Sequence, residues 1–293
     1  MPEGHTLFRL ARDLDAAFGG RPVQVSSPTG KFAADAAVLD GGVMLGAESA
    51  GKHLFCAFEG ERYIHIHLGL IGKFDITEGL VVPPMGQVRL RLVSTSPATG
   101  PAYADLRGAT QCELIGAAKR AQVLERLGPD PLRADADPDR AWTRIHRTHR
   151  PIGELLMDQT VLAGVGNVYR AEVLFRHRMH PLRPGNTLRR GQFDAVWADL
   201  VALLAEGVRT GRIDTVGPDH TPEAMGRPPR VDDHGGEVYV YRRTGQPCLV
   251  CGSTVRTAEL AGRNSFWCPK CQPTFRSRAG RSANAAPRAG GSA

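Results

Sequence analysis

The sequence predicts an α+β protein with several domains, and three observations support this fold class. Strand-like patterns fill most of the first 118 residues, helical patterns follow, and four cysteines with the spacing of a metal-binding hairpin lie near the carboxyl end. The chain has 293 residues, 42% of them hydrophobic, so it is long enough for more than one core. We expect domains at 2–118, 119–236 and 237–272, and a disordered basic tail at 273–293.

A helix is expected almost at the amino terminus. Apolar residues recur at helical spacing from Leu7 to Phe18, and Gly19-Gly20 ends the segment. Thr6 precedes the first apolar residue and is the predicted N-cap.

A long region of strand pattern follows this helix. Residues 54–58 form a short apolar run, residues 63–68 alternate with period two, and strand patterns continue at 88–93 and 103–106. Antiparallel strands with short turns indicate a sandwich or a barrel and argue against a parallel sheet.

Helical patterns dominate after about residue 118. The prolines at 129 and 131 open this region, and Asp137-Pro138-Asp139 starts a helix with acidic residues in its first turn. The segment from 207 to 236 is predicted to be a loop. Three amphipathic helices are expected at 151–159, 168–178 and 188–206.

The strongest local pattern is a pair of C-x2-C motifs, formed by Cys248, Cys251, Cys268 and Cys271. Four thiolates in this arrangement suit one tetrahedral Zn²⁺, and they leave no position for water, so the ion is expected to be structural. Two disulfides would need an oxidising compartment, to which nothing in the sequence points, and a redox C-x-x-C would not need a second copy.

The other two cysteines and the histidines receive structural interpretations. Cys56 and Cys112 lie in apolar, strand-like surroundings and are expected to be buried thiols. A metal site is the alternative for the histidines, but no acidic residue accompanies them at ligand spacing, so we expect hydrogen-bonded structural side chains. The histidines considered are His65, His67, His146 and His149.

The charge distribution favours a nucleic-acid partner. The chain carries a net charge of +7, and residues from 242 onward hold nine Lys and Arg against the single acid Glu259. A metal-clamped basic module is suited to phosphate, although a charged surface can also serve solubility alone. The first residues lack a secretory pattern and no long apolar run occurs, so we expect an intracellular protein without a membrane span.

Pro2 and Glu3 are candidates for covalent chemistry. Removal of Met1 would leave Pro2 as a terminal secondary amine with a pKa of about 8, which can attack an aldehyde-level carbon and form an iminium. Glu3 would then donate and accept protons beside it. On these two residues alone, the simpler interpretation is an ordinary processed terminus.

Four separated motifs in a fixed order change this assessment. They are Pro2-Glu3-Gly4, residues 66–72 (IHLGLIG), residues 164–172 (GVGNVYRAE) and the zinc finger. Together they resemble the formamidopyrimidine-DNA glycosylase/endonuclease VIII family of base-excision repair enzymes, over residues 2 to about 272.

The resemblance implies a fold and a reaction. It implies an N-terminal β-sandwich, a helix-two-turns-helix domain and a zinc-finger β-hairpin, with damaged DNA in the cleft between the domains and the damaged nucleotide flipped out. It further implies a bifunctional DNA glycosylase/AP lyase that acts through a Schiff base and cuts the strand by β- and δ-elimination. Pro2 would be the nucleophile, Glu3 the proton donor, and Lys52 the catalytic lysine on a hairpin that also meets the phosphate.

The resemblance also assigns residues that bind DNA. Asn167 and Arg263 match positions that contact the phosphates around the lesion, and Leu70 matches the residue that wedges into the vacated stack. The amide groups at the start of the helix opened by Asn167 are expected to face a phosphate.

The chain departs from the family pattern in ways that place it nearer endonuclease VIII. Thr6 stands where many members have a second glutamate, Leu70 replaces the Met of the purine-specific branch, and residues 105–109 lack the Arg-Phe pair of that branch. These differences predict action on oxidised pyrimidines and abasic sites, and weaker action on intact duplex.

The sequence is therefore consistent with two functions. The first is the glycosylase/lyase, acting as a monomer at the nucleoid, and the second is a noncatalytic relative that only binds damaged DNA. Retention of Pro2, Glu3 and Lys52 together favours the enzyme.

Overall fold

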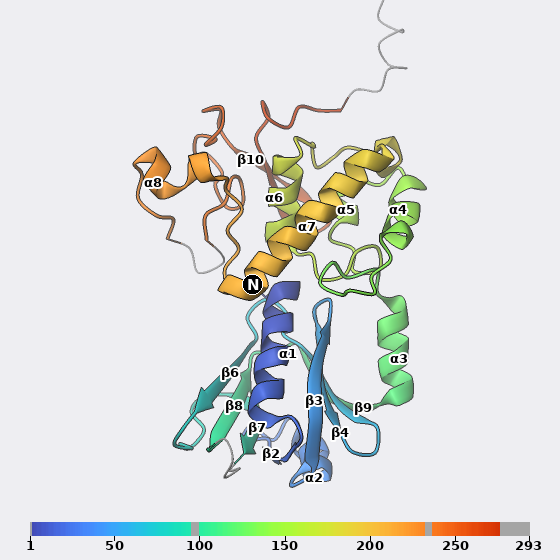
Figure 1. The fold of residues 1–293 in the computed structure, drawn as a ribbon, viewed down its shortest axis with the longest axis vertical. Helices are drawn as coiled ribbons and strands as arrows, with labels where there is room; N and C mark the ends of the chain where they lie inside the picture. Colours follow the sequence, from blue (N-terminus) through green and yellow to red (C-terminus); the bar gives the residue numbers. More distant parts are fainter. Residues whose placement is uncertain (1, 95–99, 232–235, 276–293) are drawn as a thin grey trace, which may run out of the picture.

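The computed structural model describes residues 2–94, 100–231 and 236–275. Figure 1 shows two stacked halves, a β-sandwich below and a helical lobe (residues 127–231) above, with the finger (residues 245–274) beside the lobe. Helix α1 (Gly4–Phe18) begins where the two halves meet (Figure 1). The predicted disordered tail falls outside the described residues from 276 onward.

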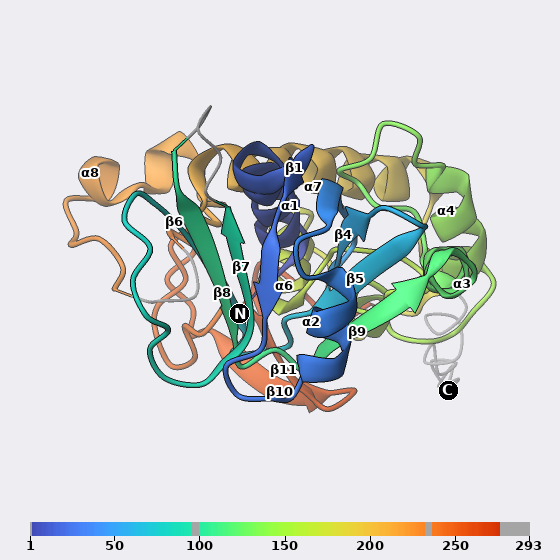
Figure 2. The ribbon, with the colours of Figure 1, turned by 90° about the horizontal axis from the view of Figure 1, so that it is seen from below.

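The β-sandwich consists of two antiparallel sheets, as expected for one of the two architectures that the strand pattern allowed. Viewed from below, β6, β7 and β8 lie on one side and β4, β5 and β9 on the other (Figure 2). One sheet has the order β1-β3-β4-β5-β9 and the other β2-β7-β8-β6. The strands are β1 (Arg21–Pro22), β2 (Gln24–Ser26), β3 (Val43–Ala50), β4 (His53–Phe58), β5 (Arg62–His67), β6 (Lys73–Glu78), β7 (Val88–Ser94), β8 (Ala102–Arg107) and β9 (Gln111–Gly116).

Period-two alternation builds the sandwich core. Ile64 and Ile66 of β5 are fully buried in the core between the sheets, whereas His65 and His67 lie on the opposite face of the same strand. Cys56 of β4 is buried in this core, in agreement with the predicted buried thiol, and burial raises the pKa of the thiol to about 12.

Helix α1 (Gly4–Phe18) adds one face to the same core. Its apolar residues recur at helical spacing, and the helix packs on β3. The prediction that Thr6 is the N-cap is wrong, because the helix begins three residues earlier than expected and Glu3 occupies the N-cap position. The carbonyl oxygen of Glu3 accepts the N–H of Thr6, which makes the first turn.

The helices of the remaining chain match the predicted positions only in part. Helix α6 is buried on all sides from Asn167 to Phe175, so the predicted amphipathic pattern is wrong there. Helix α5 covers only four residues of the predicted 151–159, because Asp158 takes part in a turn in which its carboxylate binds Thr160. The helices are α2 (Ala33–Leu39), α3 (Ala117–Arg126), α4 (Pro138–His146), α5 (Ile152–Leu155), α6 (Asn167–Arg176), α7 (Arg190–Thr210) and α8 (Pro222–Met225), with 3-10 turns η1 (Gly185–Thr187) and η2 (Pro218–His220).

The finger is a two-stranded hairpin of β10 (Arg256–Leu260) and β11 (Arg263–Trp267) beside the four cysteines. Ala261 and Gly262 form its tight turn, both with positive φ. Its base packs on the helical lobe, where the Gln272 side chain donates to the Met179 carbonyl at 2.8 Å. Among the helices of the described residues, none combines the length and the apolar character needed to span a membrane.

Candidate active site

A cleft of about 630 Å³ lies where the sandwich, the helical lobe and the finger meet. The structure brings together five of the six residues that were predicted to act on or bind DNA. They are Pro2, Lys52, Leu70, Asn167 and Arg263, all of which line this cleft.

The sixth residue, Glu3, is fully buried beside Pro2 and is tied to the start of α6. Its carboxylate accepts the backbone N–H groups of Gly166 at 3.0 Å, Val168 at 2.8 Å and Tyr169 at 3.4 Å. Burial raises the pKa of Glu3, while Lys52 and these three amides act in the opposite direction. The amides at the start of α6 were predicted to face a phosphate, and this expectation is wrong for the three that Glu3 occupies.

Two glycines allow this approach. A Cβ at Gly166 would lie 2.2 Å from the Glu3 carboxyl carbon, and a Cβ at Gly4 would lie 2.8 Å from the Cα of Gly164. The Gly4 N–H also donates to the Gly164 carbonyl at 2.8 Å. The Pro-Glu-Gly start and the GVGN segment therefore form one packed unit.

Lys52 lies on the turn between β3 and β4, where Gly51 has a φ of 58°. Burial lowers the pKa of the Lys52 ammonium, the nearby Arg263 and Arg170 lower it further, and Glu3 raises it. A lysine with a lowered pKa has a larger neutral fraction near pH 7 and can exchange protons there.

Asn167 belongs to a buried network that connects α6 with the finger. Its side-chain amide donates to the Asn264 carbonyl at 3.1 Å, and its oxygen accepts from Arg170. Arg170 donates to the same Asn264 carbonyl at 2.9 Å and to Gly153. Burial lowers the pKa of Arg170 to about 10. Arg170 was not predicted as a site residue, and only its position three residues after Asn167 on one helix face could have suggested it.

The two remaining predicted residues sit on hairpin tips. Arg263 follows the β10–β11 turn and is exposed. Leu70 lies in the turn between β5 and β6 with 49% of its surface exposed, and the neighbouring Ile71 is 78% exposed. Gly69 precedes them with a positive φ and packs against Thr110, so that both apolar side chains project from a tight turn.

One side of the cleft is acidic, which the sequence did not reveal. Glu154 and Asp158 line it together with Arg150, which donates to the first at 2.9 Å and to the second at 3.1 Å. The Arg150 guanidinium compensates part of their negative charge, so that this wall of the cleft is less repulsive to a phosphate backbone.

The four predicted zinc ligands converge as a single group. The sulfur atoms of Cys248, Cys251, Cys268 and Cys271 all lie within 4.8 Å of one another. Sulfur atoms around tetrahedral Zn²⁺ at a Zn–S distance of about 2.3 Å are about 3.8 Å apart, which fits the distances of 3.9 Å for Cys248–Cys271 and 3.4 Å for Cys251–Cys268. The residues therefore suit one structural zinc ion.

The histidines near the cleft are hydrogen-bonded, as predicted, but one of them has an acidic partner. His65 contacts Glu113 at 3.2 Å and His53 at 2.9 Å, and His67 contacts Thr110 at 3.1 Å. Glu113 lies directly opposite His65 in the β5–β9 register, so its sequence position gave no sign of the contact. In the part of the chain that the structure describes, the cysteine cluster is the group with metal-binding geometry.

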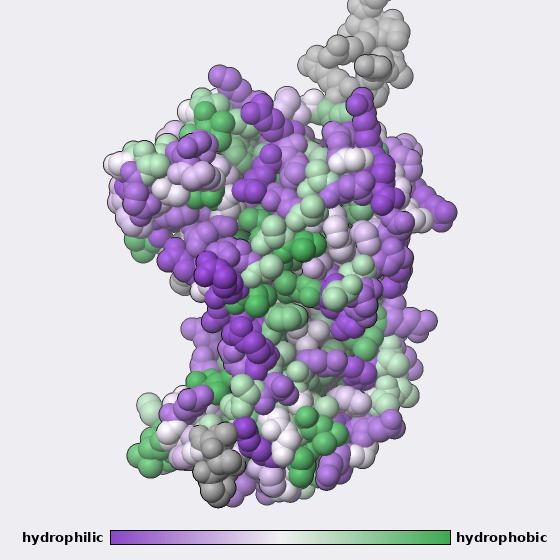
Figure 3. Space-filling view, in the orientation of Figure 1, coloured by the Kyte–Doolittle hydropathy of each residue, from purple (hydrophilic) through white to green (hydrophobic). Residues whose placement is uncertain are grey.

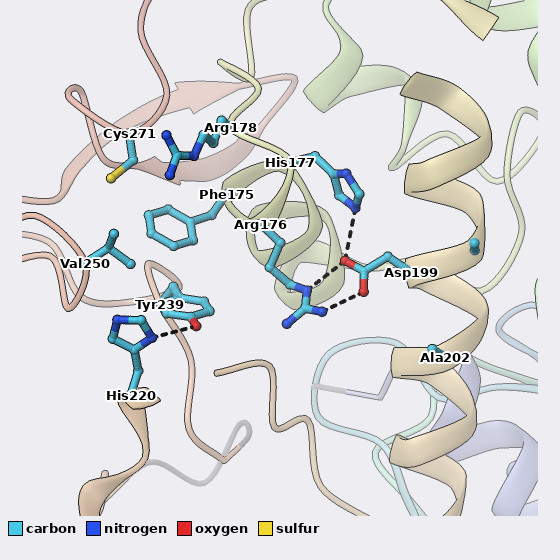
Figure 4. A pocket seen from close by; sticks show the side chains of 11 residues that line it. Phe175, Arg176, His177, Arg178, Asp199, Ala202, His220, Tyr239, Val250 and Cys271 are labelled. Atoms are coloured by element: carbon cyan, nitrogen blue, oxygen red, sulfur yellow. Dashed lines mark hydrogen bonds and ion pairs between the residues drawn. The ribbon is translucent and has the colours of Figure 1, made fainter. Parts of the chain in front are cut away.

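A second pocket of about 610 Å³ lies between α6, α7 and the finger (Figure 4). It is separate from the cleft that Pro2 and Lys52 line. Asp199 accepts from Arg176 at 2.7 Å and contacts His177 at 3.2 Å. Despite burial, the hydrogen bonds from His177 and Arg176 lower the pKa of Asp199 to about 2. This carboxylate already has two partners, and of the predicted site residues only the zinc ligand Cys271 lines the pocket.

The face drawn in Figure 3 is mostly hydrophilic, with hydrophobic residues near its centre.

Three family models match consecutive parts of the chain. The formamidopyrimidine-DNA glycosylase N-terminal domain matches residues 1–112, the H2TH domain of the same enzyme matches 127–217, and a zinc finger found in FPG and IleRS matches 245–274. These matches confirm the resemblance drawn from the four motifs and the order of sandwich, helix-two-turns-helix domain and finger.

Individual relatives agree with the models. The chain is 53% identical to endonuclease 8 1 of Mycobacterium tuberculosis (strain ATCC 25618 / H37Rv) over 276 residues, 93% of this chain and 100% of the relative. It is 33% identical to the formamidopyrimidine-DNA glycosylase of Thermomicrobium roseum over 77% of the chain and 80% of that protein. The MutM (Fpg) protein from Thermus thermophilus superposes with a TM-score of 0.72 at 27% identity, covering 94% of this chain and 100% of that one.

Proposed function

This chain belongs to the formamidopyrimidine-DNA glycosylase/endonuclease 8 family of DNA glycosylases, and we propose that it removes oxidised bases from DNA and then cuts the strand. The observation that carries the proposal is the convergence of Pro2 and Lys52 on one cleft, with Glu3 held against the start of α6 beside them.

The proposed reaction begins at Pro2. After removal of Met1, the lone pair of the proline nitrogen forms a bond to C1′, the damaged base leaves with the electron pair of its glycosidic bond, and the proline N–H proton passes to the departing base. Glu3 donates a proton to the deoxyribose oxygen as the ring opens, which leaves an iminium between Pro2 and C1′. Loss of a C2′ proton then expels the 3′ phosphate, and a second elimination expels the 5′ phosphate.

Lys52, Asn167 and Arg263 serve this reaction through the phosphates in our proposal. The lowered pKa of Lys52 suits it to exchange protons during elimination while it remains near the phosphate. The charged guanidinium of Arg263 at the finger tip would donate paired hydrogen bonds to phosphates of the same DNA strand. Asn167 fixes that tip through its hydrogen bond to Asn264. Bound zinc would keep the finger folded, so that Arg263 stays directed into the cleft.

We further propose oxidised pyrimidines and abasic sites as the preferred substrates. Identity of 53% to a protein named endonuclease 8 supports this assignment, as do Leu70 and the missing Arg-Phe pair. Leu70 and Ile71 are the exposed apolar side chains available to fill the vacated stack. The proposal includes a monomer acting on DNA at the nucleoid, with domains at 2–118, 119–236 and 237–272.

A lesion panel tests this function. Purified protein is incubated with matched oligonucleotides that contain an oxidised pyrimidine, an oxidised purine, an abasic site or no lesion, as duplex and as single strands. We expect cleavage with elimination ends at the first and third, and faster single-strand than duplex cleavage. Binding to damaged DNA without any cleavage would support the noncatalytic relative instead.

A further inference from the structure

Asp130 of the helical lobe bonds the turn that carries Lys52. One carboxylate oxygen accepts the Gly51 N–H at 2.7 Å, and the other accepts the Leu132 N–H at 2.9 Å. The residue is 7% exposed and does not line the cleft, so it reaches Lys52 only through the backbone of its neighbour.

This bond is the polar part of a tight contact between the two halves of the molecule. A Cβ at Gly51 would lie 3.0 Å from the Cβ of Ala163 and 3.1 Å from the Gly164 nitrogen, so the turn is pressed against the segment that precedes α6. Two N–H donors stabilise the ionised carboxylate in a place where burial would otherwise favour the acid. Burial raises the pKa of Asp130, and the amides of Leu132 and Gly51 oppose that change.

The same segment also holds the start of the chain. The Gly164 carbonyl accepts the Gly4 N–H at 2.8 Å, and a Cβ at Gly164 would lie 3.4 Å from Asp130, 3.5 Å from Gly4 and 3.7 Å from Gly51. The helical lobe therefore sets where Pro2 and Lys52 lie relative to each other, although both belong to the sandwich half.

We infer that Asp130 is a positioning residue for Lys52, which it keeps at the distance from Pro2 that strand cleavage requires. The inference rests on the proposed function. Its physical basis is that a displacement of about 1 Å can cost on the order of a hundredfold in rate. Arg263 and Asn167, the other proposed phosphate contacts, belong to β11 and α6 and lie outside this turn.

The first experiment is a double-mutant cycle on abasic-site DNA. Asp130→Ala should lower the single-turnover cleavage rate at least about tenfold, while the dissociation constant changes less than about threefold. When Lys52 is already replaced by alanine, Asp130→Ala should lower the cleavage rate by less than a further factor of about two, because Asp130 acts through Lys52. The cleavage rate of Asp130→Asn, which keeps one acceptor oxygen, should lie between the rates of Asp130→Ala and the wild type. Asp135→Asn, at an exposed acid paired with Arg133, is the matched control and should leave the rate unchanged.

A second readout does not need activity. The chain has only five lysines, so reductive ¹³C-methylation gives few NMR signals, and the Lys52 signal can be assigned from Lys52→Arg. Asp130→Asn should shift the Lys52 signal and its titration midpoint, while the signals of Lys31 and Lys270 stay in place. An unchanged Lys52 signal, or an equal loss of rate with and without Lys52, overturns the inference. Absence of cleavage by the wild type contradicts the proposed function, and the NMR comparison still decides the role of Asp130.

Discussion

The carboxylate of Glu3 accepts a hydrogen bond from the backbone N–H of Val168 at 2.8 Å, although the two residues are 165 positions apart. Free N–H groups at the start of a helix attract negative charge, and α6 presents them to an acid at the beginning of the chain. The bond ties the amino terminus to the helix whose first residue, Asn167, holds the finger. The proposed nucleophile Pro2 is thus fixed by its neighbour.

Glu3→Gln should separate the two proposed activities. Burial raises the pKa of Glu3 above the ordinary value of 4.5, which keeps more of the proton-donating acid available as the pH rises. We expect base excision to fall by a factor on the order of 10² to 10⁴, because the sugar loses its proton donor. Strand cleavage at a ready-made abasic site should fall much less. The measurement compares the two rates on otherwise identical DNA, and equal losses would remove Glu3 from the first step.

Arg263→Ala should weaken binding equally across lesions, since phosphate contacts carry no base information. The slope of the logarithm of the binding constant against the logarithm of salt concentration should shrink by about one. Arg263→Lys is the matched control, because it keeps the charge and therefore the slope. Asn167→Ala should also weaken binding uniformly, as it removes one of the two hydrogen bonds that hold the Asn264 carbonyl at the finger tip. Weakening confined to one lesion would mean that these side chains read the base.

Cys251→Ser should remove the zinc and weaken DNA binding while the sandwich stays folded. Its half-buried sulfur lies in the four-cysteine group, far along the chain from the sandwich core. Metal analysis should give one zinc per wild-type chain and less in the variant, with sandwich unfolding unchanged in a chemical denaturation curve. Cys56→Ala should keep the zinc, because that thiol is buried between the sheets. A wild-type protein purified without chelators that contains no zinc would contradict the assignment.

Acid should destabilise the contact between α1 and the helical lobe through His5. Burial, followed by the charge of Arg9, lowers the pKa of His5 to about 4. Its ring packs edge-on against Tyr169 with the ring centres 5.4 Å apart. Between pH 6.5 and about 4 the unfolded chain binds a proton that the folded chain does not, so the free energy of unfolding falls as the pH falls. The loss reaches at most about 3 kcal/mol.

The variant His5→Gln isolates this effect, because His53 has its pKa lowered to about 4 as well and also contributes to the acid sensitivity. The stability difference between wild type and variant should shrink from about pH 7.5 to about pH 4.5 in denaturant titrations. A difference that is the same at both pH values would exclude His5 as the titrating group.

Local patterns predicted those elements whose surroundings are simple. The alternation in β5 predicted a strand with one buried face, and the C-x2-C pairs predicted the finger. Helix α3 begins where the chain was predicted to change to helices, but it was given no bounds of its own, and it buries no residue completely. Helix α6 was assigned the wrong pattern because other elements cover all of its sides, which no local period can reveal.

The candidate site likewise contains residues that the sequence predicted and residues that only the structure identified. Pro2, Lys52 and Arg263 were found through family motifs, and their shared cleft depends on contacts between distant parts of the chain. The roles of Arg170 and Asp130 follow from hydrogen bonds to Asn264 and Gly51, which are 94 and 79 positions away. Such pairings are fixed by the packing of the two halves and leave no trace in spacing or composition.

The most direct test of the account is covalent trapping at Pro2. Protein confirmed by mass spectrometry to begin at Pro2 is mixed with abasic or oxidised-pyrimidine DNA, duplex and single-stranded, in the presence of borohydride. We predict a stable protein–DNA adduct whose DNA fragment maps to Pro2, because borohydride reduces the iminium to an amine. Retention of Met1 should abolish the adduct but leave binding intact. If the processed protein binds these DNAs and yields no adduct with any of them, the covalent mechanism is contradicted.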